Sequence, residues 1–349
     1  MHQNINPAPV ETAIHDAMGR PMRDLRISVT DTCNLRCPYC MPQEEYGDQY
    51  EFLSSGELLS FSEIARLAGI FTRLGVSKIR LTGGEPLLRP RLPDLVRSLQ
   101  DIEGVEEIAL TTNGVLLAKH AHALRQAGLT RITVSLDSLD PKAFGQMNGR
   151  GLTPDKVLAG LDAALDAGFT GIKLNVVVQR GMNEHTLMDL IERFRGTDSI
   201  VRFIEYMDVG NRNGWRLEEM VPSAEIVRTI HERYPLTPLD ENYPGEVATR
   251  YAFEDGAGEI GFISSVTEPF CGSCTRARLS ADGRLYTCLF ASTGADLRTL
   301  LRAEATDEEL LKEVVGIWTR RADRYSELRA SGTQLGAKLH KVEMYQIGG

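Results

Sequence analysis

Apolar and polar residues alternate along six short segments in the first two-thirds of the chain. Alternation with a period of two is typical of β-strands, because successive side chains point to opposite faces. It predicts strands at residues 24–30, 78–82, 107–111, 131–136, 171–178 and 199–206. Between them, apolar residues at helical spacing predict helices at residues 61–74, 91–99, 117–127, 154–167 and 184–194. Regular alternation of strand and helix favours a parallel sheet.

One face of these predicted strands is polar. Strands buried on both faces of an open parallel sheet are usually apolar throughout. A polar face therefore indicates a barrel, whole or partial, whose lumen holds a charged ligand at the carboxyl ends of the strands. We expect an α/β fold, an incomplete (β/α)6 TIM-like barrel. Its polar face is carried by Arg26, Ser28, Lys78, Arg80, Thr82, Thr133, Ser135, Asp137, Lys173 and Asn175.

The pattern changes at about residue 236, and this change sets the expected domains. Residues 1–20 are predicted to be a flexible arm, and residues 21–235 to be the partial barrel. Residues 236–349 form a C-terminal region with a proline-rich connection and short β-segments at 250–253, 259–264 and 284–287. A helix is predicted at residues 307–323, before a tail that ends in Gly348 and Gly349.

Charge and composition exclude several classes of function. The 349 residues carry a formal charge of −9, which argues against a general nucleic-acid binder. No apolar core of a secretory signal stands near the N-terminus, and no apolar run approaches the roughly 18 residues of a membrane span. We therefore expect a cytoplasmic protein without membrane or nucleic-acid partners. Thiols stay reduced in that compartment, so clustered cysteines are more often metal ligands than disulfides.

All six cysteines fall into two groups of three. A structural zinc site normally takes four protein ligands, and disulfides need an even number. Three thiolates suit a four-iron cluster that leaves one iron open for another ligand. The chain therefore indicates two such clusters, at Cys33, Cys37 and Cys40 and at Cys271, Cys274 and Cys288. A zinc-stabilised binding module without catalysis is the alternative.

The first group, with the spacing Cys-x3-Cys-x2-Cys after the first strand, resembles the radical S-adenosylmethionine (SAM) superfamily. Gly83-Gly84-Glu85-Pro86 after the second strand matches the segment of that superfamily that holds the methionine amino group. The resemblance implies a [4Fe–4S] cluster on the first three cysteines, with Glu85 supplying negative charge. It also implies SAM contacts at Tyr39, Gly84, Ser135 and Met207.

The second group encloses Thr275-Arg276-Ala277-Arg278, and here the chain resembles the GTP 3′,8-cyclase family of molybdenum-cofactor biosynthesis. The resemblance runs from about residue 20 to the terminal Gly-Gly. It implies a second [4Fe–4S] cluster whose open iron meets guanine, a tail that reaches the active site, and Arg202 and Asn175 as further lumen residues. The implied GTP contacts are Arg26, Arg80, Thr111, Lys173, Arg276, Ala277 (through its backbone) and Arg278.

The family's reaction is the expected activity. Cleavage of SAM yields a 5′-deoxyadenosyl radical that takes hydrogen from C3′ of GTP, and the ribose then attacks C8 of guanine. The resemblance implies an electron donor, product transfer to cyclic pyranopterin monophosphate synthase, and a monomer or homodimer. A radical enzyme that modifies a peptide and carries an auxiliary cluster is the rival within the enzyme class.

Overall fold

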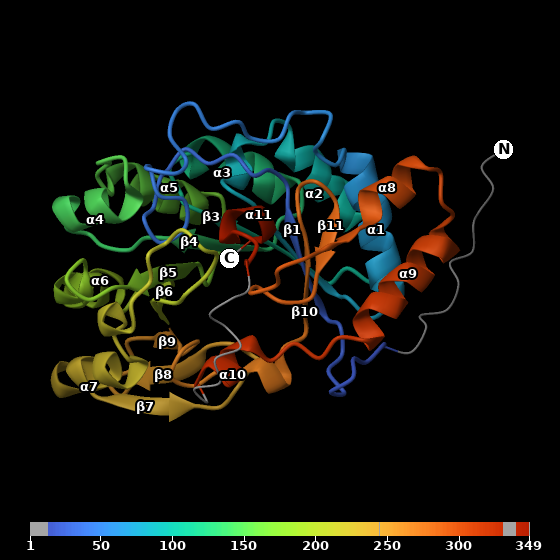
Figure 1. Ribbon diagram of the computed structural model, residues 1–349. Coiled ribbons are helices and arrows are strands. Elements are labelled where there is room, and N and C mark those ends of the chain that lie inside the picture. The colour runs from blue at the N-terminus through green and yellow to red at the C-terminus, as the bar shows by residue number, and fades with distance from the viewer. Residues whose placement is uncertain (1–12, 244, 331–339, 349) are drawn as a thin grey trace.

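A computed structural model describes residues 13–243, 245–330 and 340–348. Its centre is six parallel strands that lie side by side in chain order and are joined by helices (Figure 1). The predicted incomplete barrel is therefore confirmed. The strands are β1 (Asp24–Ser28), β2 (Lys78–Thr82), β3 (Glu107–Thr112), β4 (Arg131–Ser135), β5 (Lys173–Val178) and β6 (Ile200–Glu205).

Helices cover the outer face of these strands. Alternation in β2 buries Ile79 and Leu81 in the core against the helices and leaves Lys78 and Arg80 on the lumen face. The first helix begins with a capping box between Ser60 and Glu63, a common helix start. The covering helices are α1 (Phe61–Arg73), α2 (Leu92–Gln100), α3 (Leu117–Gln126), α4 (Pro141–Asn148), α5 (Asp155–Asp166) and α6 (Leu187–Phe194).

Among these covering helices, the structure differs from the prediction in two places. The segment expected as one helix at 184–194 is a 3₁₀ turn, Glu184–Thr186, followed by α6. Helix α4 was not predicted because it is short, although Asp140 caps its start and Gly149 ends it with a positive φ of 63°.

The C-terminal region extends the same sheet at both ends. Strand β9 (Glu259–Ile263) pairs in parallel with β6 and continues through β8 (Thr249–Phe253) to β7 (Leu236–Leu239). At the other end, β10 (Arg276–Leu279) pairs in parallel with β1 and continues through β11 (Arg284–Tyr286) to β12 (Ala295–Asp296). The described residues thus form one open sheet of 12 strands. The change of pattern at residue 236 does not separate two sheets.

Five further helices complete the described chain. Helix α7 (Ser223–Arg233) follows β6, and α8 (Leu297–Arg302), α9 (Asp307–Thr319) and α10 (Tyr325–Ala330) follow β12. The short α11 (Met344–Ile347) contacts β1 and lies at the centre of the view in Figure 1. None of the described helices is both long and apolar enough to cross a membrane.

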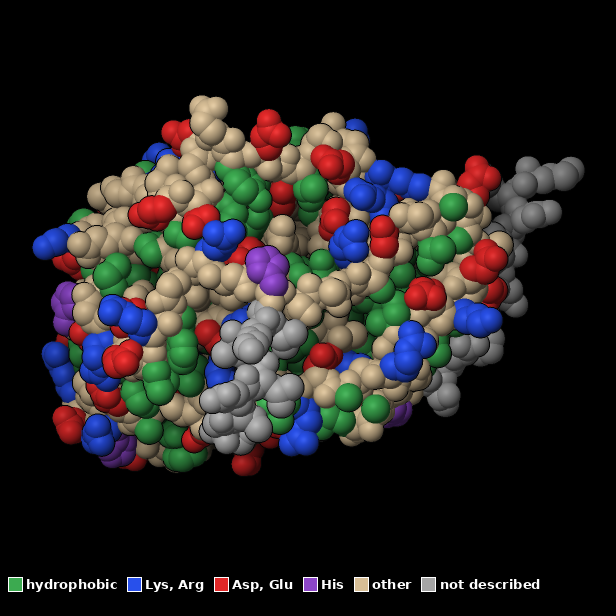
Figure 2. Space-filling view, viewed as in Figure 1, with side chains coloured by type: hydrophobic (Ala, Val, Ile, Leu, Met, Phe, Trp, Pro, Cys, Tyr) green, Lys and Arg blue, Asp and Glu red, His purple; other side chains and the backbone are tan. Residues whose placement is uncertain are grey.

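Residues 13–20, which were expected to belong to a flexible arm, pack against the molecule. Asp16 is buried and bonds the guanidinium of Arg20 at 2.6 Å. The backbone of Ala17 donates to the carbonyl of Arg321, 304 positions later. Residues 1–12 of the expected arm lie outside the described residues. On the face seen in Figure 2, acidic and basic side chains are interspersed without a broad patch of either sign.

Candidate active site: two cysteine-bearing cavities

Two cavities contain the two cysteine triplets. The first is lined by Cys33, Cys37 and Cys40, and the four residues expected to contact SAM also line it: Tyr39, Gly84, Ser135 and Met207. The second is lined by Cys271, Cys274 and Cys288, and every residue expected to contact GTP lines it except Ala277. The side chain of Ala277 packs instead in the core, so only its backbone is available to a ligand.

The loop of the first triplet is fixed by its own backbone and by Arg36. Cys40 and Met41 donate backbone hydrogen bonds to the carbonyl of Cys37 at 3.0 and 2.8 Å. The buried Arg36 guanidinium donates to the carbonyl of Cys33 at 2.8 Å and to that of Tyr46. Arg36 was missed by sequence reasoning, which gave a role to Tyr39 but to no other residue between the cysteines. It holds the loop in shape around the cysteines.

The two glycines after β2 allow close approach to this loop. A Cβ on Gly83 would overlap the carbonyl oxygen of Thr30, and one on Gly84 would overlap that of Thr32. Gly84 also donates its backbone N–H to Thr30 at 2.9 Å. Only glycine allows the chain after β2 to lie this close to the cysteine loop.

Glu85 is fully buried and joins two strand ends. Its carboxylate accepts hydrogen bonds from the Thr112 hydroxyl at 2.7 Å, from the Asn113 backbone at 2.8 Å and from the Leu87 backbone at 3.0 Å. Burial raises its pKa to about 7 despite these bonds. These hydrogen bonds already engage the carboxylate oxygens and connect the end of β2 to β3. Glu85 therefore has a structural role in addition to the expected role toward an ammonium group.

Tyr39 and Asp137 connect the cysteine loop to β4. The Tyr39 hydroxyl donates to Asp137 at 2.8 Å, and Asp137 also accepts from the backbone of Val177 at 2.9 Å. Burial raises the pKa of Asp137 to about 6. The hydroxyl of Tyr39 is thus engaged within the protein, which leaves its ring to line the cavity.

The second cavity is strongly cationic because strand register places arginines side by side. Arg26 of β1 aligns with Arg80 of β2 on one side and with Arg278 of β10 on the other. Burial and the neighbouring arginines lower the pKa of Arg26 well below its ordinary value. Burial lowers the pKa of Lys173 to about 7, with smaller contributions from the positive charges of Arg202 and Arg131. Such mutual repulsion is relieved when a polyanion binds.

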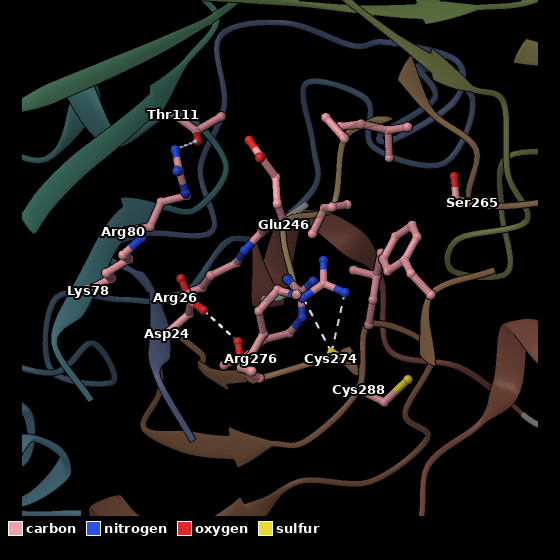
Figure 3. Close-up of a pocket in the computed structure, with 18 of the residues that line it drawn as sticks. Asp24, Arg26, Lys78, Arg80, Thr111, Glu246, Ser265, Cys274, Arg276 and Cys288 are labelled. Carbon is pink, nitrogen blue, oxygen red and sulfur yellow. Dashed lines mark hydrogen bonds between the residues drawn. The ribbon is translucent and has the colours of Figure 1, made fainter. Parts of the chain in front are cut away.

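Polar contacts orient several of these cations. Arg80 donates to the hydroxyls of Thr111 at 3.3 Å and Thr133 at 3.2 Å, and Figure 3 shows Arg80 joined to Thr111 on one wall. Arg202 donates to the amide oxygen of Asn175 at 2.8 Å, which brings together the two further lumen residues.

Arg276 lies against a cysteine of the second triplet. Its guanidinium donates to the sulfur of Cys274 through two nitrogens, each at 3.3 Å (Figure 3). Burial alone would raise the pKa of Cys274, but Arg276 and Arg321 outweigh it and lower the pKa to about 6. Burial instead raises the pKa of Cys288 to about 11, and it raises the pKa of all three thiols of the first triplet, that of Cys33 to about 11. Cys274 is therefore held as a thiolate, the form that binds metal.

The C-terminal tail lies beside both cavities: Met344 and Tyr345 line the first, and Gly348 contacts Arg278, which lines the second. The buried guanidinium of Arg278 donates to the carbonyls of Gly348 and Ile347. A Cβ on Gly348 would overlap the side chain of Thr82. The expectation that the tail reaches the active site agrees with these contacts for Gly348, whereas Gly349 lies outside the described residues.

Sequence reasoning missed several residues that line the second cavity. Lys78 and Arg131 begin β2 and β4 on the lumen side, and Lys78 lies 3.8 Å from the ring centroid of Tyr243. The alternation of β2 already placed Lys78 on the polar face. Tyr243 and Glu246 belong to the irregular connection, where no periodicity indicates which side chains face inward.

Each triplet brings three thiol side chains to one cavity. Among the described residues, no three His, Cys, Asp or Glu side chains converge where one metal ion would be held. In a four-iron cluster, each thiolate binds a separate iron atom. The three cysteines of each triplet nevertheless line one cavity.

The two cavities meet. Thr111, Asn175, Ile204, Met207 and Leu289 line both of them, so they form a shared wall between the two triplets. The two cavities therefore adjoin at these residues.

Comparison with known proteins gives the same picture. The family model described as Radical SAM superfamily matches residues 27–194, and the model described as Molybdenum Cofactor Synthesis C matches residues 199–327. The GTP 3′,8-cyclase of Xanthomonas campestris pv. campestris (strain B100) is 54% identical over the whole of both chains. That of Acidothermus cellulolyticus is 55% identical over 96% of this chain and 99% of its own.

A solved structure shares the fold. Streptococcus suis SuiB, in a crystal structure bound to S-adenosylmethionine, has a TM-score of 0.58 at 15% identity, over 89% of this chain and 68% of that one. The partial barrel and the cysteine loop after β1 thus define a member of the radical SAM superfamily. Within it, the chain belongs to the GTP 3′,8-cyclase family, whose members match it along nearly their whole length. Superfamily membership implies SAM and a [4Fe–4S] cluster as cofactors.

Proposed function

We propose that this protein converts GTP to (8S)-3′,8-cyclo-7,8-dihydroguanosine 5′-triphosphate, the first step of molybdopterin biosynthesis. The observation that carries the proposal is the pair of adjoining cavities, one with each triplet, of which the second is lined by cations. Relatives 54% and 55% identical carry the name of this activity. They favour it over the rival peptide-modifying enzyme, since the likeness to SuiB is in fold alone.

In this proposal, each cavity has its own ligand. Cys33, Cys37 and Cys40 hold the first cluster, and Tyr39, Gly84, Ser135 and Met207 surround SAM. When bound, this cluster supplies the electron that cleaves SAM and so starts the radical reaction. Cys271, Cys274 and Cys288 hold a second [4Fe–4S] cluster that meets the guanine base.

The cationic residues orient GTP. Arg26 of β1 lies beside Arg278 of β10, and Arg276 precedes Arg278 by two residues on the same strand. Arg80 lies on the neighbouring β2, and Lys173 lies on β5 across the lumen. Arginine forks suit phosphate oxygens, so this wall binds the triphosphate. The ribose then lies toward the shared wall at Thr111 and Met207, next to the first cavity. Holding ribose and base in an attack geometry is worth roughly 7–11 kcal/mol in the best intramolecular cases.

We also propose the partners that this reaction requires. An electron donor serves the clusters, and the product passes to cyclic pyranopterin monophosphate synthase. Reduced thiols in both triplets fit a cytoplasmic location.

The test is a reconstitution under anaerobic conditions with iron, sulfide, GTP, SAM and a reductant. We expect 5′-deoxyadenosine and the cyclised nucleotide in equal amounts, and about eight irons per chain from two four-iron clusters. Cys271→Ala is expected to give no cyclised nucleotide, because the second cluster is lost. Formation of 5′-deoxyadenosine by the unaltered protein without any nucleotide product would contradict the GTP assignment.

A further inference from the structure

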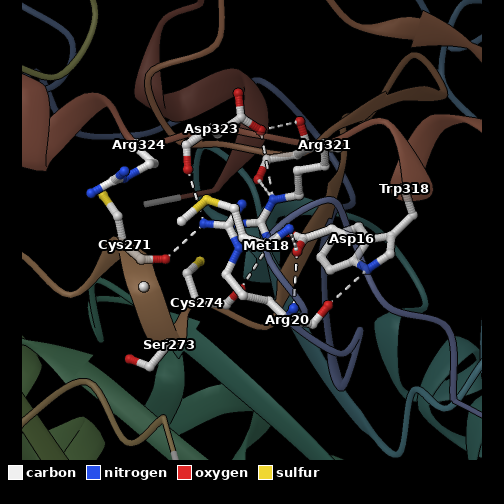
Figure 4. A network of polar contacts seen from close by, with 12 residues as sticks. Asp16, Met18, Arg20, Cys271, Ser273, Cys274, Trp318, Arg321, Asp323 and Arg324 are labelled. Carbon is white, nitrogen blue, oxygen red and sulfur yellow. Dashed lines mark hydrogen bonds and ion pairs between the residues drawn. The ribbon is translucent and has the colours of Figure 1, made fainter.

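A buried polar network lies next to the cysteines of the second triplet (Figure 4). Its centre is Asp16, whose carboxylate bonds Arg20 at 2.6 Å and Arg321 at 3.1 Å. The three side chains are 0%, 2% and 1% exposed. The three residues come from opposite ends of the chain, so the network forms only in the complete fold.

The two arginines bind the backbone at or next to all three cysteines of the second triplet. Arg20 donates to the carbonyl of Cys271 at 2.7 Å. Arg321 donates to the carbonyl of Cys274 at 2.8 Å and to that of Thr287, the residue before Cys288, at 3.1 Å. One carboxylate thus fixes two guanidinium groups, which in turn hold the Cys271–Cys274 turn and the segment before Cys288 together.

The arginines are themselves held in place. The indole nitrogen of Trp318, in α9, donates to the carbonyl of Arg20 at 3.2 Å, and the Arg321 guanidinium lies 4.5 Å from the Trp318 ring centroid. Asp16 also accepts from the backbone of Arg20 at 2.9 Å. Few alternative rotamers remain for either arginine, which gives the network the rigidity that metal sites need.

One donor of this network is unused. Nη2 of Arg20 is buried and has no hydrogen-bond partner among the described residues, although Arg20 lines the cavity of the second triplet. A buried donor without a partner is costly. Hydrogen bonds to cluster sulfurs are known to set reduction potentials. The free Nη2 is therefore available to a sulfur of whatever occupies this cavity.

We propose that Asp16, Arg20 and Arg321 are positioning residues for the second cluster, and that Nη2 of Arg20 donates to one of its sulfurs. The inference rests on the proposed second cluster. The network presents the three thiolates in the arrangement that a cluster requires, and it acts on the cysteines through their backbone. Loss of partners around metal ligands typically weakens metal binding 10–100-fold.

The test isolates each triplet. In full-length protein with Cys33, Cys37 and Cys40 replaced by alanine, iron reports on the second triplet alone. Arg20→Lys and Arg321→Lys in this background keep the charge but lose the fork that spans the carbonyls. We expect roughly 10–100-fold faster loss of iron to a chelator in both variants. In Arg20→Lys we also expect a more negative reduction potential of the remaining cluster, followed by electron paramagnetic resonance.

The reciprocal background provides the control for folding. With Cys271, Cys274 and Cys288 replaced by alanine, the same lysine variants are expected to keep the first cluster with an unchanged spectrum. Arg302→Lys is the matched control, because Arg302 similarly binds a carboxylate, Glu63, and two backbone carbonyls, those of Gly56 and Leu58, away from the cysteines.

The outcomes separate the two proposals. Absence of iron at the second triplet in the parent protein would contradict the proposed second cluster itself. Normal iron retention and potential in both lysine variants would overturn the positioning role. Equal loss of iron from both triplets would also overturn it, because the network would then support the fold in general.

Discussion

Single residues in this protein decide how closely separate loops approach. Gly84 illustrates this, because an added methyl group would overlap backbone atoms of the cysteine loop that follows β1. The clash is with carbonyl oxygens, which cannot move without moving the loop. Gly-Gly was visible in the sequence as a turn, but the closeness of the other loop could not be read from it.

We predict that Gly84→Ala impairs SAM cleavage. A displacement of the cysteine loop by about 1 Å is expected to lower 5′-deoxyadenosine formation about 100-fold. Gly69→Ala is the control, since no atom lies within 4 Å of its added Cβ in α1. That change should leave the activity intact and stabilise the helix by about 0.5–1 kcal/mol. Equal activity of the two variants would contradict the close-approach argument.

Lys173 gives a prediction on pH. Its pKa of about 7 leaves it largely neutral at pH 8 in the free protein, because burial and nearby arginines disfavour its charge. A bound triphosphate favours the charged form, so GTP binding should take up a proton above pH 7 and weaken as pH rises, by up to roughly tenfold per unit.

Titration calorimetry of GTP binding at pH 8, in two buffers of different ionisation enthalpy, measures this proton. The heat should depend on the buffer in the unaltered protein and much less in Lys173→Arg, whose charge is permanent. Identical heats in both buffers for the unaltered protein would show that Lys173 does not change its protonation.

At the scale of elements, local patterns predicted the six barrel strands and the segment that forms β9, but not β10. Alternation defines β2 and β5 because each has one buried face. Strand β10 has only four residues, and its partner β1 lies about 250 positions earlier. Its pairing depends on sheet order, which periodicity does not contain. Because Arg26 and Arg278 are separated by a similar number of residues in the sequence, their alignment could not be predicted either.

Asp208, in the loop after β6, connects two C-terminal elements. Its carboxylate accepts from the Tyr325 hydroxyl of α10 at 2.5 Å and from Lys341 at 2.8 Å, and it pairs with Arg329. Asn211 adds hydrogen bonds to the backbone of Lys341. This loop therefore attaches α10 and residues 340–348 to the barrel.

We predict that Asp208→Asn loosens these elements. Arg329 and Lys341 would lose their carboxylate partner at a largely buried position, which lowers the free energy of unfolding by about 3 kcal/mol. Limited proteolysis should then remove the C-terminal residues faster than in the unaltered protein. Arg212→Gln, which removes an exposed pair with Glu45 from the same loop, is the control. Equal proteolysis of both variants would assign the attachment to other contacts.

At the scale of the whole molecule, charge is unevenly distributed. The chain is acidic overall, at −9, yet a buried cavity gathers arginines and lysines from β1, β2, β5, β6 and β10. The sequence motifs indicated most of these cations and all six cysteines. They could not indicate that the two cavities share a wall, because that wall combines residues from β3, β5, β6 and two later loops.

We therefore predict that inorganic tripolyphosphate stabilises the protein against heat. At a concentration 100 times its dissociation constant, the gain is about 2.7 kcal/mol, and it should shrink at high salt. Differential scanning calorimetry measures the shift in Tm. The double variant Arg276→Gln with Arg278→Gln should lose most of it, and an undiminished shift there would place the anion elsewhere.

The pairing of β10 with β1 has a consequence for biosynthesis. As the ribosome extends the nascent chain, β1 emerges early, but its outer edge has no strand to pair with until β10 follows. At roughly 5–20 residues per second, these 250 or so residues take about 12–50 s. An unpaired strand edge invites wrong pairing. Productive synthesis of this protein thus depends on keeping that edge covered, by a chaperone or by transient contacts, until translation is nearly complete.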